Sequence, residues 1–101
     1  MALQLKDMRL VAHRGFIDGK WVDADAGGRF AVTNPASGET IAEVADMGAA
    51  ETRRAIEAAQ RALPGWRAKP AKERAVVLRK WYELILAHAE DLALLMTTEQ
   101  G

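Results

Sequence analysis

The spacing of apolar and polar residues divides this chain into two parts. Up to about residue 44, short apolar stretches alternate with polar residues, which is typical of β-strands. From about residue 49 onward, apolar residues recur at spacings of three and four, which is typical of amphipathic helices. The pattern therefore predicts an α+β arrangement, with two β-hairpins within residues 14–44 followed by two or three helices.

Each hairpin has its own turn chemistry. Asp18-Gly19 stands between apolar residues, and a two-residue turn with positive φ at both central positions strongly favours this pair. In the second hairpin Asn34 can bond its own backbone, Pro35 fixes φ, and Gly38 can adopt a positive φ. We predict a tight chain reversal at both places.

The first helix is predicted over residues 49–63. Gly48 stands at the N-cap position, and Glu51 lies in the first turn, where the helix dipole stabilises a carboxylate. Pro64-Gly65 is predicted to end this helix, because proline has no N–H to donate and glycine weakens a helix interior.

Two further helices are predicted over residues 71–88 and 90–99. Pro70 opens the first of them at a position where its missing N–H costs nothing. The apolar face of residues 75–96 is so wide that we expect it to be buried on most sides. Two small hairpins and an alanine-rich helix offer too little apolar surface to cover this face, so we expect a larger partner surface and a chain that continues beyond Gly101.

The composition narrows the possible functions. The 14 basic residues balance the 14 acidic ones and neither sign forms a block, so we expect no nucleic acid or membrane partner. The absence of cysteine removes disulfides, thiolate metal sites and a cysteine nucleophile from these residues. No apolar run approaches the roughly 18 residues of a spanning helix, and we expect a cytoplasmic protein.

Few residues suggest chemistry of their own. Four carboxylates lie in helical segments: Glu73, Glu90, Asp91 and Glu99. We predict that they are dipole-compensating or solvated groups and not acid–base catalysts. His13 and His88 have no histidine or cysteine at ligand spacing, so no metal site is expected on side chains. Gly27-Gly28 lacks the spacing of a dinucleotide-binding loop and is predicted to be a hairpin connection.

Several segments, in this order and at this spacing, resemble the N-terminal portion of the aldehyde dehydrogenase superfamily. They are residues 17–21 (Ile-Asp-Gly-Lys-Trp), 34–39 (Asn-Pro-Ala-Ser-Gly-Glu), 52–59, Trp66, Glu73-Arg74 and 99–101 (Glu-Gln-Gly). The resemblance runs from about Phe16 to Gly101. Within the superfamily, the chain looks most like succinate-semialdehyde dehydrogenases, with glutarate-semialdehyde enzymes as close relatives.

This resemblance implies that residues 1–101 belong to the α/β, Rossmann-like cofactor domain of an enzyme that uses NAD or NADP. Such an enzyme oxidises an aldehyde, here succinate semialdehyde, to the acid through a cysteine thiohemiacetal and a thioester. In family members the reacting and cofactor-binding residues lie beyond the position of Gly101. We therefore expect no catalytic or cofactor-binding residue in this stretch, which alone is predicted to be inactive. The resemblance also implies a homo-oligomer, a dimer or tetramer, for the full-length protein.

Two alternatives stay open. In several family members the carbonyl of the residue before Asn-Pro helps to bind a structural monovalent cation, which makes the backbone carbonyl of Thr33 a candidate metal ligand. The other interpretation of Thr33 is a turn residue that ends a strand. For the whole chain, the rival hypothesis is a complete small α+β binding module that docks a partner through residues 75–96.

Overall fold

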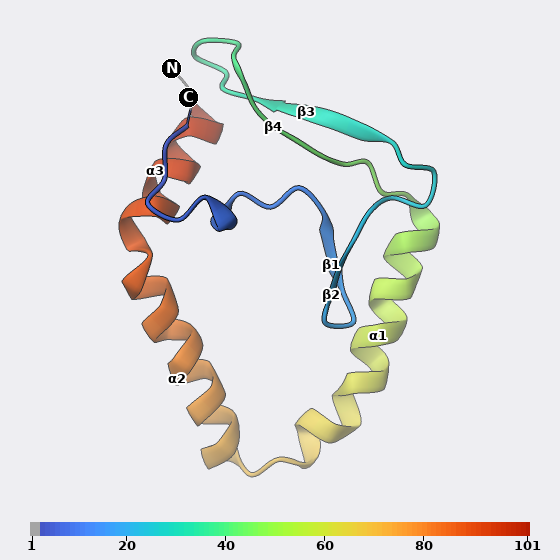
Figure 1. The fold of residues 1–101 in the computed structure, drawn as a ribbon. Helices are drawn as coiled ribbons and strands as arrows, with labels where there is room; N and C mark the ends of the chain where they lie inside the picture. Colours follow the sequence, from blue (N-terminus) through green and yellow to red (C-terminus); the bar gives the residue numbers. More distant parts are fainter. Residues whose placement is uncertain (1–2) are drawn as a thin grey trace.

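A computed structural model describes residues 3–101, which form two small antiparallel sheets followed by three helices (Figure 1). The elements are η1 (Met8–Leu10), β1 (Gly15–Ile17), β2 (Lys20–Val22), β3 (Arg29–Thr33), β4 (Thr40–Ala45), α1 (Ala49–Ala68), α2 (Ala71–Ala87) and α3 (Ala89–Gln100). Strand β1 pairs with β2, and β3 pairs with β4. The predicted α+β class, with two hairpins before the helices, is confirmed.

The first hairpin turns at the predicted residue pair. Asp18 has φ 52° and Gly19 has φ 75°, so both central residues adopt positive φ, as this class of two-residue turn requires. Phe16 and Trp21 face each other across the strands, with ring centroids 5.0 Å apart and planes tilted by 55°. This aromatic pair reinforces a hairpin of only three residues a strand.

The second hairpin reverses around Asn34. The Asn34 N–H donates to the Glu39 carbonyl at 2.9 Å, and its side-chain oxygen accepts the Ala36 N–H, also at 2.9 Å. Gly38 has φ 76° and donates its N–H to the Asn34 carbonyl at 2.7 Å. The hydrogen bonds of Asn34 and the positive φ of Gly38 therefore close this turn, as predicted.

Helix α1 corrects one prediction. It does not end at Leu63 but continues through Pro64 to Ala68. A proline inside a helix removes one donor and crowds the carbonyl four residues earlier, yet here the residues after Pro64 still form the last turn of α1. The end lies at Lys69, whose extended backbone (φ −68°, ψ 138°) is the conformation that a residue before proline prefers, so Pro70 sets the boundary and Pro64 does not.

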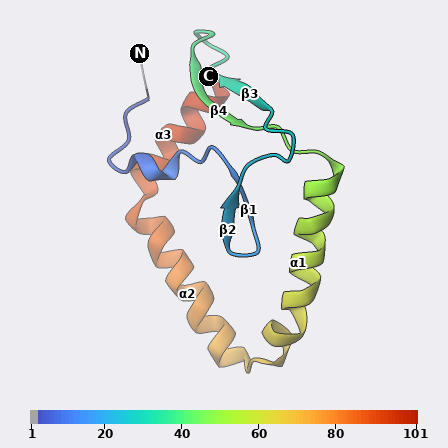
Figure 2. The same ribbon diagram turned by 45° about the vertical axis from the view of Figure 1, so that its right-hand side comes forward.

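Helices α2 and α3 form one continuous arm on the other side of the molecule, called here the helical arm. The helices expected over 71–88 and 90–99 are Ala71–Ala87 and Ala89–Gln100, and His88 alone separates them. Figures 1 and 2 show α1 and α2 diverging from their connection, with the hairpins lying between α1 and the arm. The result is an open frame.

Almost nothing is buried in this frame. Among the described residues only Leu5 and Ala24 are buried apolar residues, and their exposed fractions are 8% and 5%. Within residues 3–101, no helix combines the length and apolar character needed to cross a bilayer.

Candidate functional site

The largest unusual feature of the molecule is a bare apolar surface on the helical arm, called here the arm surface. Its large apolar side chains are Val76, Val77, Leu78, Trp81, Tyr82, Leu84, Ile85, Leu86, Leu94 and Met96. Their exposed fractions lie between 44% for Leu94 and 63% for Trp81. The described residues therefore leave this face uncovered, as the width of the apolar pattern led us to expect. A contiguous apolar surface of this kind marks an interaction face.

One polar group on α2 lacks a hydrogen-bond partner among the described residues. The Nε atom of Arg74 is buried from solvent and has no hydrogen-bond partner among residues 3–101. A buried donor without a partner costs free energy, so a native environment normally supplies an acceptor. Further along, Arg79 pairs with Glu83 at 3.4 Å and lies 5.4 Å from the centre of the Tyr82 ring.

The first hairpin lies against a stripe of alanines on α1. Ala55 and Ala58 are half-buried, and this stripe and the Asp18-Gly19 turn together line a hollow of about 340 Å³. Because alanine side chains are short, the hairpin can approach the helix closely. The Arg61 guanidinium lies 3.8 Å from the Asp18 carboxylate at the edge of this contact.

Two carboxylates are the only buried polar residues among those described. Glu51 and Asp91 each have an exposed fraction of 6%, and each is the third residue after its helix's N-cap, which is Gly48 in α1. At this position a carboxylate meets the positive end of the helix dipole. Both side chains also accept backbone N–H groups from distant loops.

The partners of these two carboxylates differ in number. Glu51 accepts the Asp25 N–H at 3.3 Å, whereas Asp91 accepts the Lys6 and Asp7 N–H groups at 2.9 Å, one on each oxygen. Asp91 was expected to be a dipole-compensating or solvated group. It stands in the first turn of α3 as expected, but it is buried, and no local pattern in the sequence indicates partners 84 and 85 residues away.

Surface ion pairs lie near the loops that bond to Glu51 and Asp91. Arg54 holds the Asp25 carboxylate with two hydrogen bonds of 2.7 and 2.9 Å, which lowers the pKa of Asp25 below its usual value. Arg9 hydrogen-bonds Asp7 through its side chain and backbone, and these contacts lower the pKa of Asp7 to about 2. These groups fix loops at the surface and have no arrangement suited to catalysis.

Thr33 lies where β3 meets the second turn. It is exposed, it stands opposite Thr40, and the strand register is irregular between Val32 and Thr33. Within residues 3–101, no three histidine, cysteine, aspartate or glutamate side chains converge as a metal site would require. A cation at the Thr33 carbonyl would therefore need further ligands from elsewhere.

The second turn also contacts the end of the helical arm. A Cβ atom on Gly101, which has φ 80°, would lie 2.8 Å from Pro35 Cγ and 2.9 Å from the Ala36 nitrogen. Such distances are too short for any side chain, so glycine is the residue that permits this close approach.

The glycines of the chain do not fit a dinucleotide. Gly27 has φ 75° and donates its N–H to the Ala24 carbonyl at 2.9 Å, while the Gly28 carbonyl accepts the Asp46 N–H at 2.9 Å. Strand β3 follows them, whereas a pyrophosphate site needs a helix N-terminus at this point. These residues form the connection between the two hairpins, from β2 to β3.

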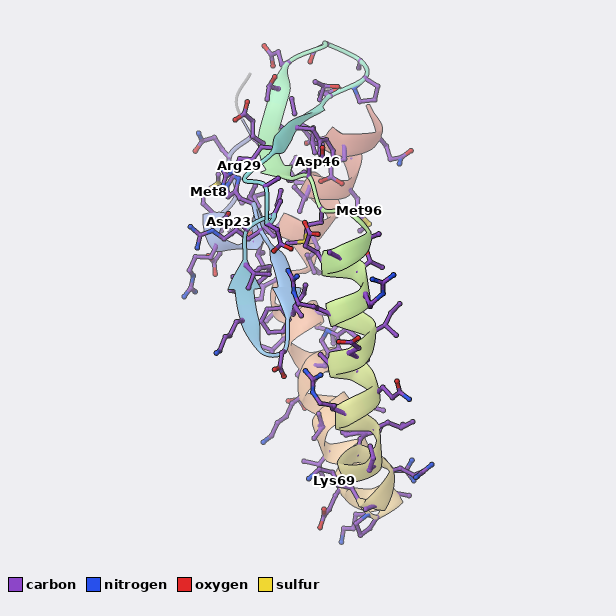
Figure 3. The ribbon with its side chains drawn as sticks, turned by 90° about the vertical axis from the view of Figure 1, so that its right-hand side faces the viewer. Met8, Asp23, Arg29, Asp46, Lys69 and Met96 are labelled. Carbon is purple, nitrogen blue, oxygen red and sulfur yellow. The ribbon has the colours of Figure 1, made fainter. Side chains whose placement is uncertain are left out.

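A hollow of about 520 Å³ between the N-terminal segment and β2 contains several basic side chains. Its lining residues are Arg9, Val11, Ala12, His13, Arg14, Trp21 and Arg29. Arg14 and Arg29 both contact Asp23 at 3.3 Å, and Figure 3 shows Arg29 and Asp23 side by side at the hairpin end of the molecule. Arg14 and Arg29 therefore share one carboxylate oxygen, Oδ1 of Asp23.

This chain is similar in sequence to proteins of one known family. The model of the aldehyde dehydrogenase family matches residues 21–101. Over 99 residues the chain is 59% identical to a glutarate-semialdehyde dehydrogenase of Pseudomonas putida and 56% identical to a 3-sulfolactaldehyde dehydrogenase of Pseudomonas putida. These alignments cover 98% of this chain, but only 21% of the first relative and 20% of the second.

A solved structure agrees in fold as well as in sequence. The succinate-semialdehyde dehydrogenase of Burkholderia pseudomallei is 55% identical, with a TM-score of 0.92 over 96% of this chain and 20% of that one. The chain therefore spans about a fifth of the length of the relatives it matches.

Proposed function

Because the chain belongs to the aldehyde dehydrogenase family, we propose that it forms the N-terminal part of an NAD(P)+-dependent semialdehyde dehydrogenase. The observation that supports this proposal best is the agreement of sequence and fold with such enzymes over almost the whole chain. On this proposal, residues 1–101 form hairpins and outer helices of the cofactor domain, and their role is structural.

The exposed apolar side chains of the arm surface and one donor that is unpaired among the described residues, Arg74 Nε, support a structural role. Trp81 and its apolar neighbours on the arm surface expose about half of their area, and Arg74 Nε has no acceptor within residues 3–101. Each needs a neighbour that the described residues do not supply. We propose that later parts of the same enzyme cover the arm surface and accept a hydrogen bond from Arg74.

The chemistry would then belong to residues beyond Gly101. The proposed reaction needs a cysteine nucleophile, and this chain has no cysteine. The cofactor, NAD or NADP, would accept the hydride, and we propose that residues beyond Gly101 hold it. This stretch alone is accordingly proposed to be inactive.

We propose succinate semialdehyde as the substrate, with glutarate semialdehyde, one methylene longer, as the competing candidate. The relatives named above carry glutarate semialdehyde, 3-sulfolactaldehyde and succinate semialdehyde in their names, and all three compounds are aldehydes that bear an acidic group. The substrate class that best fits these relatives is therefore a short aldehyde with an anionic end.

Two finer points remain proposals that rest on the family. One is a monovalent cation bound in part by the backbone carbonyl of Thr33, which ends β3 beside an irregular register. The other is that the full-length enzyme is a dimer or tetramer.

The experiment is a kinetic comparison on the full-length protein. We expect aldehyde-dependent reduction of NAD+ or NADP+, with kcat/KM for both semialdehydes well above that for an uncharged aldehyde of equal length. The two semialdehydes are expected to differ by roughly 10–200-fold, the usual value of one methylene in a pocket. Equal rates with the uncharged aldehyde would overturn the substrate class, and no aldehyde oxidation at all would overturn the proposed function.

The arm surface also fits the rival hypothesis of a binding module that docks a partner through residues 75–96. The two hypotheses differ in what covers this face. Protection of the Trp81 side chain from solvent within the full-length chain, measured residue by residue by hydroxyl-radical footprinting, would support the enzyme. Protection only after a second protein is added would support the module.

A further inference from the structure

The N-terminal segment crosses the open frame from one side to the other. Residues 5–13, called here the N-terminal strap, begin beside α3 and end beside β4, as Figures 1 and 2 both show. The strap precedes Trp21, where the match to the family model begins. The alignments with the relatives named above cover 98% of the chain and so extend into the strap.

The strap is held at the helical arm by one buried carboxylate. Asp91 accepts the Lys6 N–H on one oxygen and the Asp7 N–H on the other, both at 2.9 Å. The carboxylate is buried, so water competes weakly for these bonds, and hydrogen bonds to a charged group are stronger than neutral ones. Leu5, one of the two buried apolar residues described, immediately precedes these two donors.

The other end of the strap is held at the second hairpin. The His13 carbonyl accepts the Ala45 N–H at 2.9 Å, and His13 Nδ1 lies 3.0 Å from the Glu43 carbonyl oxygen. The strap thus has backbone hydrogen bonds both to α3 through Asp91 and to β4. At Gly101 the arm also contacts this hairpin directly, and that contact is steric.

We propose that the strap is a clasp that fixes the helical arm relative to the hairpins, and that Asp91 is its latch. Helices α1 and α2 diverge from their connection, which leaves the far end of the arm to be held by other contacts (Figure 1). The two anchored ends of the strap set the spacing between the arm and the hairpins, because neither the start of α3 nor the edge of β4 can move without breaking hydrogen bonds. Opening the latch releases Leu5 and the first turn of α3 together.

The clasp can be tested by amide hydrogen exchange in the full-length protein. In the unaltered protein the Lys6 and Asp7 amides are expected to exchange slowly, because both are bonded to a buried charge. Asp91→Asn keeps the size of the side chain but turns one acceptor into a donor, so at least one amide loses its partner. We expect exchange at Lys6 and Asp7 to become at least about tenfold faster.

Two matched variants serve as controls. Glu90→Gln removes the exposed ion pair with Lys6 and leaves Asp91 intact, so exchange at Lys6 and Asp7 is expected to change by less than about twofold. Glu51→Gln makes the corresponding change on α1, where the remaining amide oxygen can still accept the single Asp25 N–H, so exchange at Lys6 and Asp7 is expected to stay unchanged.

Rapid exchange of the Lys6 and Asp7 amides in the unaltered protein would overturn the proposal, as would unchanged exchange in Asp91→Asn. If Asp91→Asn does not fold, a variant that lacks residues 1–7 gives the answer. A clasp predicts faster exchange at Leu92, whose N–H bonds to the His88 carbonyl at the start of α3. Unchanged exchange there would contradict it. These outcomes do not depend on enzymatic activity, so the clasp can fail while the proposed function stands.

Discussion

The N-terminal strap and helix α2 are held in opposite ways. The strap buries little apolar area, yet Asp91 and β4 fix both of its ends with hydrogen bonds of 2.9 Å. Helix α2 is 17 residues long and largely apolar, yet none of its residues is buried. Small polar contacts suffice to position a loop, whereas an apolar helix face needs a large complementary surface. The part of the chain described here supplies the first and lacks the second.

The largest expected effect comes from removing an apolar side chain of α2. Trp81 is 63% exposed, so Trp81→Ala in the 101-residue chain is expected to change stability by less than about 0.5 kcal/mol. If later residues cover Trp81 in the full-length protein, the same change there is expected to cost about 3–5 kcal/mol. Denaturant unfolding of both proteins measures the difference, and equal small effects would show that the arm surface stays bare.

A smaller effect is expected in the first hairpin. Gly19 has φ 75° with open space around it, so Gly19→Ala meets only the backbone cost of a left-handed conformation, about 1–2 kcal/mol. Gly28→Ala is the matched control, because its φ is not positive and its new Cβ would lie at an ordinary 3.8 Å from Asp46 Cβ. Thermal unfolding measures the loss of stability in each variant, and Gly19→Ala is expected to lose more than Gly28→Ala. Equal losses would contradict the turn geometry.

A still smaller effect is expected for the ion pair between Asp25 and Arg54 of α1. Arg54 hydrogen-bonds the Asp25 carboxylate and lowers its pKa. Arg54→Gln is therefore expected to raise the pKa of Asp25 toward its ordinary value, as measured by NMR titration of the carboxyl carbon. Arg53→Gln, one residue away on the exposed side of α1, is the control and is expected to leave the titration unchanged.

The smallest expected effect concerns the strap at low pH. Because Arg9 lowers the pKa of Asp7 from 3.8 to about 2, this contact contributes fully above pH 3.8 and is lost as the pH falls through about 2. NMR titration of Asp7 is expected to show a midpoint near 2, and Arg9→Gln is expected to move the midpoint upward. A midpoint near 3.8 in the unaltered chain would contradict the Arg9 contact.

The sequence predicted the local structure well wherever a local rule decides it. Asp18-Gly19 and Asn34 determine their own turns through φ preferences and short-range hydrogen bonds. The predicted end of α1 at Leu63 was wrong. Two prolines lie near this boundary, and the helix ends at Lys69, the extended residue before Pro70, and not at Pro64.

The hydrogen bonds between Asp91 and the strap could not be predicted in the same way. Asp91 stands in the first turn of α3, which the sequence shows, but its partners Lys6 and Asp7 are distant along the chain and donate only backbone groups. Backbone donors leave no pattern in side-chain chemistry. The proposed role of the Thr33 carbonyl has the same difficulty, since any residue type offers the same ligand atom.

The most direct test of the central claim compares the 101-residue chain with the full-length protein in one assay. Each is mixed with succinate semialdehyde, or glutarate semialdehyde, and NAD+ or NADP+, and formation of the reduced cofactor is followed. The account predicts reduction by the full-length protein and none by the chain that ends at Gly101, at equal concentration. Turnover by the 101-residue chain would contradict a purely structural role for these residues, and failure of the full-length protein with both aldehydes would contradict the proposed enzyme.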